Sequence, residues 1–422
     1  FATYPQQHAP IAVHAPAAGK TFFVYGGADP EATGGGLEHM VSFFDHADGT
    51  VPRPVRLLAK GTGDAHDNPV LSIDSAGRLL VVSPSHGTAR ESSIHRSTRP
   101  FDITEWQRVD GANRSYPQVW WLPGAERFLL LHTRYEDKRR TLRIASSADG
   151  ADWTEPELFA DAEMGHYQVS ARDPAGDRVG TAFDLHPDRG RPGTGLDWRT
   201  NLSYAETTDG GRTWRSAAGE QVTLPIVEAR SPALVRDFRA EGKSVYLKDL
   251  AFTPDGRPVI LFLTAAGFMP GPEGAPREWQ TAAWSGSEWI FRPLAESDHA
   301  YDHGSLHCDA DGTWRVVAPT DPGPFPGGAG GEMVLWISSD EGRSWSRRPL
   351  TGGSPFNHGY ARTPLEADPG FHALWADGSP LAPSPSRLFF CTRDGRVFRL
   401  PEHMEGEREA PEALPPPPAG RE

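Results

Sequence analysis

Short apolar runs alternate with turns rich in Gly, Asp and Pro along nearly the whole chain. Runs of four or five apolar residues stand at 79–82, 128–131, 259–263 and 334–337. Runs of this length suit buried β-strands, and no segment of normal helical length shows a competing period of three to four residues. The pattern therefore predicts an all-β chain built from many short strands.

One turn motif recurs between these apolar runs. Its clearest copies are SSADGADW at 146–153, TTDGGRTW at 207–214 and SSDEGRSW at 338–345, and weaker relatives lie near Asp74, Asp255, Asp309 and Asp394. In this motif Asp and Gly shape a hairpin turn, and the Trp is free to pack between adjacent sheets. A unit that repeats along most of a chain indicates a repeat architecture.

The repeat also predicts the number of sheets. Seven four-stranded blades would each take roughly 57 of about 400 residues, which suits a β-propeller. We therefore predict a single seven-bladed β-propeller with aspartate-box turns over residues 1–400, with six or eight blades as alternatives. Residues 401–422 carry several Glu and then a run of Pro, a composition that predicts a disordered tail.

Composition and charge narrow the classes of protein further. The 45 Gly, 40 Pro and 13 Trp among 422 residues leave few stretches in which a long helix could propagate. A formal net charge of −14 disfavours nucleic acid and anionic membranes as partners. No run approaches the roughly 18 apolar residues of a membrane span. No signal-peptide pattern stands at the start, so the compartment stays open with a secreted or periplasmic location favoured, and we expect a monomer.

The repeated aspartates indicate structure rather than chemistry. The pattern Ser-x-Asp-x-Gly-x-Thr-Trp is the aspartate box of sialidase-like propellers, and an Asp that accepts hydrogen bonds from its own turn amides has no free carboxylate to offer a substrate. The Arg-Ile-Pro segment usual near the N-terminus of sialidases is absent from this sequence. Function must therefore come from residues outside the repeat.

The densest polar segment outside the repeat is DAHDNP at 64–69, and Ser85-His86-Gly87 follows with His86 twenty positions after His66. Each His stands at the end of a strand-like run, so the two imidazoles can lie at the same rim of neighbouring strands in one blade. Either histidine alone could instead be hydrogen-bonded in a turn or core. The pair at this spacing indicates a site that faces the central cavity.

Other candidates flank this pair along the chain. Tyr116, Arg134 and Arg199 each stand near the end of a strand-like run, where an Arg is often only a surface ion pair. Gln7 and His8 could reach the axial cavity, because propellers commonly close by pairing the first strand into the last blade.

Two later loops are unusually polar for a propeller. They carry His299, Asp302 and His303 in one loop and His358 in the other. These histidines could line the mouth of the pocket. Alternatively, His299, Asp302 and His303 could hold a cation.

With these residues in view, the chain resembles the BNR-4 repeat propellers, which include ulvan lyases, rhamnosyl-glucuronate lyases and α-L-rhamnosidases. The likeness spans roughly residues 4–401. It is most specific at 64–69, in the twenty-residue step from His66 to His86, and at 116–118, 246–250 and 297–305. The resemblance implies that His66 and His86 are the catalytic His pair, with Tyr116 and Arg134 beside them and Arg199 as a second Arg that binds substrate.

The resemblance implies a lyase that cleaves a rhamnosyl-glucuronate glycan by β-elimination. Arg199 or Arg134 would neutralise the uronate carboxylate, His86 or His66 would remove the C5 proton, and Tyr116 or the other His would protonate the leaving oxygen. This chemistry requires no cofactor, no metal ligand is assigned, and a bound calcium ion is an alternative. The acidity of the chain favours a short or sparsely charged acidic, rhamnose-containing glycan over a highly sulfated polymer.

Two other functions stay open at this point. An α-L-rhamnosidase would act on the same class of glycan, and His8 would then be the decisive residue. A non-catalytic glycan-binding propeller would keep the Arg and aromatic contacts but would tolerate loss of the His pair. The paired-carboxylate hydrolase has little support, because no acidic pair stands out from the turn residues.

Overall fold

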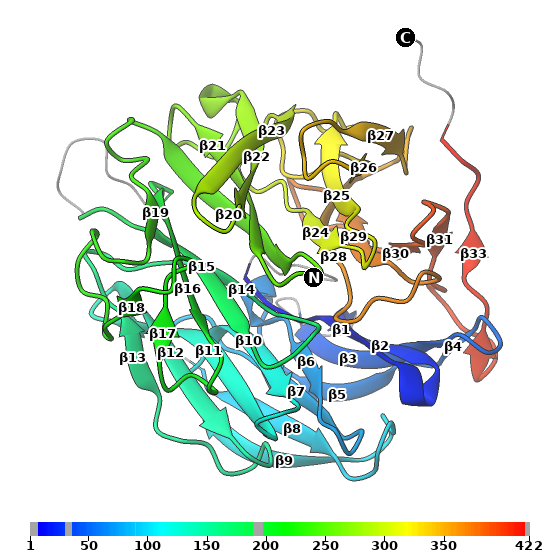
Figure 1. Cartoon of the computed structure of the whole chain (residues 1–422). Coiled ribbons are helices and arrows are strands. Elements are labelled where there is room, and N and C mark those ends of the chain that lie inside the picture. The colour runs from blue at the N-terminus through cyan, green and yellow to red at the C-terminus, as the bar shows by residue number, and fades with distance from the viewer. Residues whose placement is uncertain (1–6, 30–35, 89, 189–196, 418–422) are drawn as a thin grey trace.

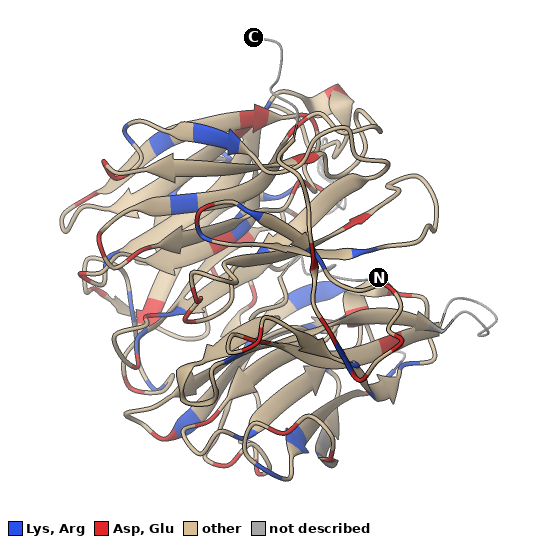
Figure 2. Ribbon diagram, turned by 90° about the vertical axis from the view of Figure 1, so that its right-hand side faces the viewer, with Lys and Arg blue, Asp and Glu red and all other residues tan. Residues whose placement is uncertain are grey.

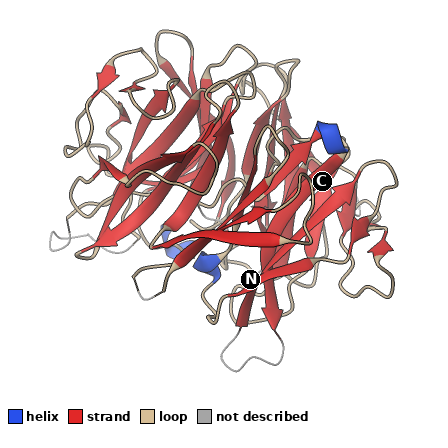
Figure 3. Ribbon diagram, turned by 90° about the horizontal axis from the view of Figure 1, so that it is seen from below, coloured by secondary structure: helices blue, strands red, loops and turns tan. Residues whose placement is uncertain are grey.

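The protein is a seven-bladed β-propeller (Figure 1). The computed structural model describes residues 7–29, 36–88, 90–188 and 197–417. Seven sheets of four to six strands surround a central axis, and neighbouring strands within each sheet pair antiparallel in a meander. Helix among the described residues is limited to three short 3₁₀ turns, which Figure 3 shows beside the strands. The all-β prediction and the prediction of a seven-bladed propeller are confirmed.

The blades follow one another along the chain. Blade 1 holds β1 (Ala12–Ala15), β2 (Lys20–Asp29), β3 (Gly36–Asp45) and β5 (Val55–Ala59). Blade 2 holds β6 (Val70–Ile73), β7 (Leu79–Ser83), β8 (Ser92–Ser97) and β9 (Trp106–Ala112). Blade 3 holds β10 (Ser115–Leu122), β11 (Arg127–Glu136), β12 (Arg139–Ser147) and β13 (Glu157–Ala160). Blade 4 holds β14 (Gln168–Arg172), β15 (Val179–Leu185), β16 (Thr200–Thr207), β17 (Trp214–Arg215), β18 (Gln221–Val222) and β19 (Leu234–Arg236).

The remaining blades repeat this plan. Blade 5 holds β20 (Ser244–Phe252), β21 (Pro258–Ala265), β22 (Arg277–Trp284) and β23 (Trp289–Ser297). Blade 6 holds β24 (Ser305–Cys308), β25 (Trp314–Asp321), β26 (Glu332–Ser338) and β27 (Ser346–Pro349). Blade 7 holds β28 (Asn357–Arg362), β29 (Ala373–Gly378), β30 (Leu388–Cys391), β31 (Val397–Arg399) and β33 (Glu412–Ala413). Outside the blades lie β4 (Val51–Pro52), β32 (Arg408–Glu409) and the 3₁₀ turns η1 (Pro16–Ala18), η2 (Ala65–Asp67) and η3 (Pro272–Gly274).

The meander fixes which strand ends share a face of the propeller. The first strand of each blade lies innermost, beside the axis (Figure 1). Neighbouring strands are antiparallel, so the chain crosses the blade in alternating directions. The first and third strands of each blade therefore begin at the same face of the propeller, and the second strand ends at that face. We call this the site face. The turns between third and fourth strands lie at the opposite face, which we call the box face.

The aspartate boxes occupy the box face and act as predicted. In the copy at 207–214, Asp209 accepts hydrogen bonds from the amide of Thr213 at 2.9 Å and from its hydroxyl at 2.7 Å. The indole of Trp214 donates to the carbonyl oxygen of Gly211 at 3.1 Å. Trp214 of blade 4 is buried and packs edge-on against Phe159 of the neighbouring blade 3. The box carboxylate is therefore committed to its own turn.

The first and last blades meet through backbone pairing near the axis. Val13 in β1 forms a parallel bridge with Leu365, just after β28. The amide of His14 donates to the Leu365 carbonyl at 2.9 Å, and the amide of Leu365 donates to the Ala12 carbonyl at 3.0 Å. In the described residues, β1 remains the inner strand of blade 1, so it does not complete blade 7 as the sequence suggested.

The C-terminal segment differs from the predicted disordered tail. Residues 401–417 run along the rim, where β32 pairs with β4 beside blade 1 and β33 pairs with β31 of blade 7 (Figure 1). The edge strand of a sheet has backbone N–H and C=O groups without partners. Residues 401–417 pair with such groups of β4 and β31. The tail therefore links the two ends of the ring, while residues 418–422 lie outside the described residues.

Charged residues of both signs are spread over the loops and blades (Figure 2), so the net charge of −14 is not gathered in one segment. Among the described residues, no helix is long and apolar enough to cross a membrane.

The aspartate boxes yield the first testable prediction. Asp209→Ala should lower the free energy of unfolding by about 1–3 kcal/mol, because it removes the acceptor for three hydrogen bonds of one turn, from the Thr207 hydroxyl and from the amide and hydroxyl of Thr213. Urea denaturation followed by circular dichroism measures this. The exposed Asp152, which lies in another box turn, provides the control Asp152→Ala, and equal losses for the two variants would contradict the structural role of Asp209.

Candidate active site

The predicted His pair lies on the site face of blade 2. His66 is in η2, directly before the inner strand β6, and His86 follows the end of β7. The start of a first strand and the end of a second strand meet at this face, so the two imidazoles stack with centroids 4.2 Å apart. The structure therefore brings together the two histidines that are twenty residues apart in sequence.

A single carboxylate holds both imidazoles. One oxygen of Asp64 lies 2.6 Å from Nδ1 of His66, and the other lies 2.9 Å from Nδ1 of His86. Asp64 also caps η2 by accepting the His66 amide at 3.0 Å. Burial alone would raise the pKa of Asp64, but hydrogen bonds from the two histidines hold it well below its usual range. An ionised carboxylate places the proton of each ring on Nδ1.

A second carboxylate fixes the loop that carries His86. The buried Asp67 accepts the amide of His86 at 2.6 Å and Nε of Arg90 at 3.0 Å. Nζ of Lys60 lies 3.9 Å from the same carboxylate. These contacts hold the His86 backbone in place independently of its ring.

A hydrogen-bonded chain runs from His86 to Tyr116 in blade 3. Nε2 of His86 lies 3.0 Å from the hydroxyl of Tyr135, which in turn lies 3.5 Å from the hydroxyl of Tyr116. Because Nδ1 of His86 carries the proton, Nε2 accepts from Tyr135. Tyr135 is at the end of β11, where second strands reach the site face.

Tyr116 is buried in a strained backbone conformation. Its φ is 49°, in the left-handed region, at an irregularity in the pairing of β10 with β11. Non-glycine residues adopt this region at a cost and often at functional sites. The bulge places the ring edge-on to both His66 and His86, with centroids 5.9 Å away. Burial raises the pKa of Tyr116 well above its usual value, so the phenol stays protonated.

Two buried arginines extend the site toward blade 5. The guanidinium carbon of Arg140, at the start of β12, lies 5.1 Å from the ring centroid of Tyr167. Arg199 lies directly before β16. Its guanidinium carbon is 4.4 Å from the ring centroid of Tyr167 and 4.7 Å from the ring centroid of Tyr246. In both arginines Nε is buried without a hydrogen-bond partner. Cations held against aromatic rings with unused donors suit an anionic ligand.

His8 lies beneath the His pair. Its Nε2 donates to the carbonyl oxygen of His66 at 2.8 Å, and its ring packs edge-on against Tyr116 at 5.5 Å. Burial lowers the pKa of His8 to about 3, so the ring is neutral. Gln7 is also buried, and its side-chain carbonyl oxygen has no hydrogen-bond partner. The N-terminal segment thus contacts the candidate site through His8.

The structure places Arg134 outside this group of residues. Arg134 has a side chain 48% exposed, with Nε 3.3 Å from a carboxylate oxygen of Glu136. Successive residues of a strand face opposite sides, so Tyr135 enters the site and Arg134 does not. The site arginine of blade 3 is Arg140, which the sequence analysis missed. Its position at the start of the third strand is the signal that could have identified it.

The later histidines divide between the rim and the core. His299 lies beside Tyr301, whose hydroxyl accepts a hydrogen bond from Arg199 at 3.3 Å, so this loop borders the site. His303 is buried and stacks on Tyr360. The structure places His358 inside blade 7, where it accepts a hydrogen bond from the indole of Trp375 at 3.0 Å and packs on Phe389.

Two groups of side chains among the described residues have the geometry to hold a metal ion. One is Asp64, His66 and His86 in the site, and the other is His14, His46 and Asp368. The predicted alternative, a cation held by His299, Asp302 and His303, is not among these groups.

A separate cavity lies at the other end of the inner strands. It has a volume of about 690 Å³ and is lined by residues at or after the ends of β14, β20, β24 and β28. None of the predicted site residues lines it. The candidate site and this cavity therefore belong to opposite faces.

Comparisons with solved structures agree with the fold. The structure of an ulvan lyase from a new polysaccharide lyase family, PL25, has a TM-score of 0.74 at 17% identity and covers 93% of both chains. A second structure of a PL25 ulvan lyase, bound to -[GlcA(1-4)Rha3S]-, has a TM-score of 0.74 at 16% identity over the same share of each chain.

Sequence comparison identifies the family. An ulvan lyase from Nonlabens ulvanivorans is 23% identical over 319 residues, which are 67% of this chain and 64% of the relative's length. The model of the BNR repeat-containing family matches residues 43–297, more than half of the 422 residues. This chain therefore belongs to the BNR repeat-containing family.

Proposed function

We propose that this protein is a polysaccharide lyase that cleaves a 4-linked uronate by β-elimination. The observation that carries the proposal is the chain of contacts from Asp64 through His86 and Tyr135 to Tyr116, beside two buried arginines. The similarity to an ulvan lyase and to a lyase bound to a glucuronate-rhamnose sulfate supports a rhamnosyl-glucuronate glycan as substrate.

The elimination needs a base, an acid and a group that neutralises a carboxylate. The C5–H and C4–O bonds break, a C4=C5 double bond forms, and the leaving oxygen takes a proton. An arginine stabilises the charge that develops on the uronate carboxylate as the C5 proton leaves. Arg140 and Arg199 hold unused Nε–H donors for this role.

His86 suits the role of base. The ionised Asp64 holds the imidazole proton on Nδ1, so Nε2 carries the lone pair. Nε2 takes the C5 proton once bound substrate replaces the Tyr135 hydroxyl as its partner. Tyr116 suits the role of acid, because its burial keeps the phenol protonated. Tyr135 connects the two, so a proton taken by His86 can return through Tyr135 to Tyr116. Asp64 is a positioning residue, since it acts through the two imidazoles.

The α-L-rhamnosidase alternative has less support from the geometry. His8 is fully buried and its Nε2 is already bonded to the His66 carbonyl. Its lowered pKa, about 3, keeps it from acting as an acid near neutral pH.

The substrate assay separates the three functions. Incubation with a rhamnose-capped glucuronate oligosaccharide should produce the ultraviolet absorbance of an unsaturated uronate. Free rhamnose without that absorbance would overturn the lyase proposal in favour of hydrolysis. Binding with neither product would show a non-catalytic propeller.

Removal of one hydroxyl tests the acid. Tyr116→Phe keeps the packing of the ring and should lower kcat roughly 10²–10⁴-fold, the usual contribution of a general acid. Steady-state kinetics on the substrate identified above measures this. Tyr204→Phe removes a buried hydroxyl that bonds Glu206 instead, so it is the matched control. Unchanged kcat in Tyr116→Phe would exclude the proposed role.

Arg140 and Arg134, which both lie in blade 3, give a direct comparison. Arg140→Ala should reduce kcat/KM by roughly 10²-fold or more, because it removes a buried donor for the substrate carboxylate. Arg134→Ala should leave kcat/KM within about twofold, since its side chain is exposed and pairs with Glu136. Thermal melting of both variants controls for folding. The reverse order of effects would restore Arg134 as the site residue.

A further inference from the structure

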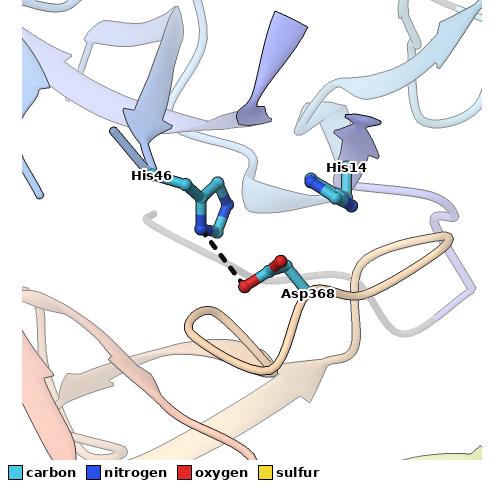
Figure 4. A group of neighbouring side chains, drawn as sticks. All are labelled: His14, His46 and Asp368. Carbon is cyan, nitrogen blue, oxygen red and sulfur yellow. Dashed lines mark ion pairs between the residues drawn. The ribbon is translucent and has the colours of Figure 1, made fainter. Parts of the chain in front are cut away.

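A second cluster of imidazole and carboxylate groups lies at the contact between the first and last blades (Figure 4). His14 is in β1 and His46 directly follows β3, both in blade 1. Asp368 is in the loop between β28 and β29 of blade 7. We call these three residues the seam cluster. They are outside the candidate active site and are not used by the elimination.

The spacing of the seam cluster suits a metal ion. Nδ1 of His46 lies 3.2 Å from Oδ1 of Asp368, and one ligand atom from each of the three residues lies within 4.8 Å of the others. Two ligand atoms bound tetrahedrally to zinc at 2.0–2.1 Å are about 3.3 Å apart. Nδ1 of His46 and Oδ1 of Asp368 already have about this separation. Figure 4 shows the rings of His14 and His46 beside the Asp368 carboxylate.

In each imidazole of the seam cluster, one ring nitrogen contacts a neighbouring group and the other is left for a metal ion. Nδ1 of His14 lies 3.1 Å from the backbone carbonyl oxygen of Glu366, which can only accept. Nδ1 of His14 therefore carries the proton, and Nε2 keeps its lone pair. Nε2 of His46 lies 2.8 Å from the hydroxyl of the buried Thr21, which leaves Nδ1 toward Asp368. Such contacts fix the tautomer and orientation of metal-binding histidines.

The carboxylate is also held in place. Oδ1 of Asp368 accepts the amide of Gly370 at 2.7 Å. The loop reaches His14 through Glu366, whose φ of 57° turns its carbonyl toward the ring. Blade 1 thus presents His14 and His46, and one loop of blade 7 presents Asp368, which lies more than 300 residues later in sequence.

We propose that His14, His46 and Asp368 form a zinc-type metal site that fastens blade 1 to blade 7. Two imidazoles and one carboxylate suit Zn²⁺, Co²⁺ or Ni²⁺, whereas Ca²⁺ and Mg²⁺ prefer oxygen ligands throughout. Three protein ligands leave a fourth position for water. A metal that binds only the closed ring stabilises the folded protein by mass action.

Cobalt binding tests the proposal in the whole chain. Asp64, His66 and His86 form the other metal-capable group, so the chain carries His86→Ala in every experiment. After chelator treatment and its removal, one equivalent of Co²⁺ should give visible absorption typical of four-coordinate cobalt. One equivalent of Zn²⁺ should displace it and raise the melting temperature by at least about 2 °C.

Variants assign the binding to the seam cluster. His46→Gln and Asp368→Asn should each reduce the affinity for Co²⁺ at least tenfold and abolish the thermal shift. Asp48→Asn is the matched control, because Asp48 lies in the same turn as His46 but is exposed and pairs with Arg408. It should bind Co²⁺ like the parent.

Asp368→Cys keeps the test informative if another variant fails to fold. A thiolate at this position should add sulfur-to-cobalt charge-transfer absorption in the ultraviolet, which a purely structural role would not produce. The proposal is overturned if the parent binds no Co²⁺, or if binding survives both His46→Gln and Asp368→Asn. It is also overturned if folded Asp368→Cys binds Co²⁺ without the charge-transfer band. None of these outcomes depends on the lyase proposal, because no step measures activity.

Discussion

The antiparallel meander of each blade is the constraint on which the chemistry of this protein depends. It brings the beginnings of first and third strands and the ends of second strands to one face. His66, His86, Tyr135 and Arg140 come from these different strand ends, yet they meet within one contiguous group. The aspartate boxes fall at the opposite face for the same reason. The direction of the strands therefore places the aspartate-box turns and the candidate site at opposite faces of the propeller.

The first and last blades of a propeller must be joined to close the ring. In this protein, contacts between blade 1 and blade 7 occur at three distances from the propeller axis. Near the axis, β1 pairs in parallel with residues after β28. Further out, His46 contacts Asp368 across the same boundary. At the rim, the C-terminal segment pairs with β4 on one side and β31 on the other. Blade 7 and blade 1 are thus joined by β1, by residues 401–417 and by one loop.

The electrostatics of the site differ from those of the whole chain. The chain carries a net charge of −14, but the site places the buried Arg140 and Arg199 against tyrosine rings, close to the histidines that Asp64 holds. The tyrosine rings supply faces that stabilise the guanidinium groups without cancelling their charge. An acidic protein can in this way present a local cationic site, which acts over a short range because salt screens the charge of the whole chain.

The sequence alone determined the repeat, and with it the propeller, because turn residues and short apolar runs are local signals. It also predicted site residues at His66, His86, Tyr116 and Arg199, which stand near strand ends, and the structure places them on one face. Only the tertiary structure decided between Arg134 and Arg140 and placed His358 in the core. It also ordered residues 401–417 by pairing them with distant edges. Which side of a strand a residue faces, and which edge lacks a partner, depend on contacts between blades that no local pattern encodes.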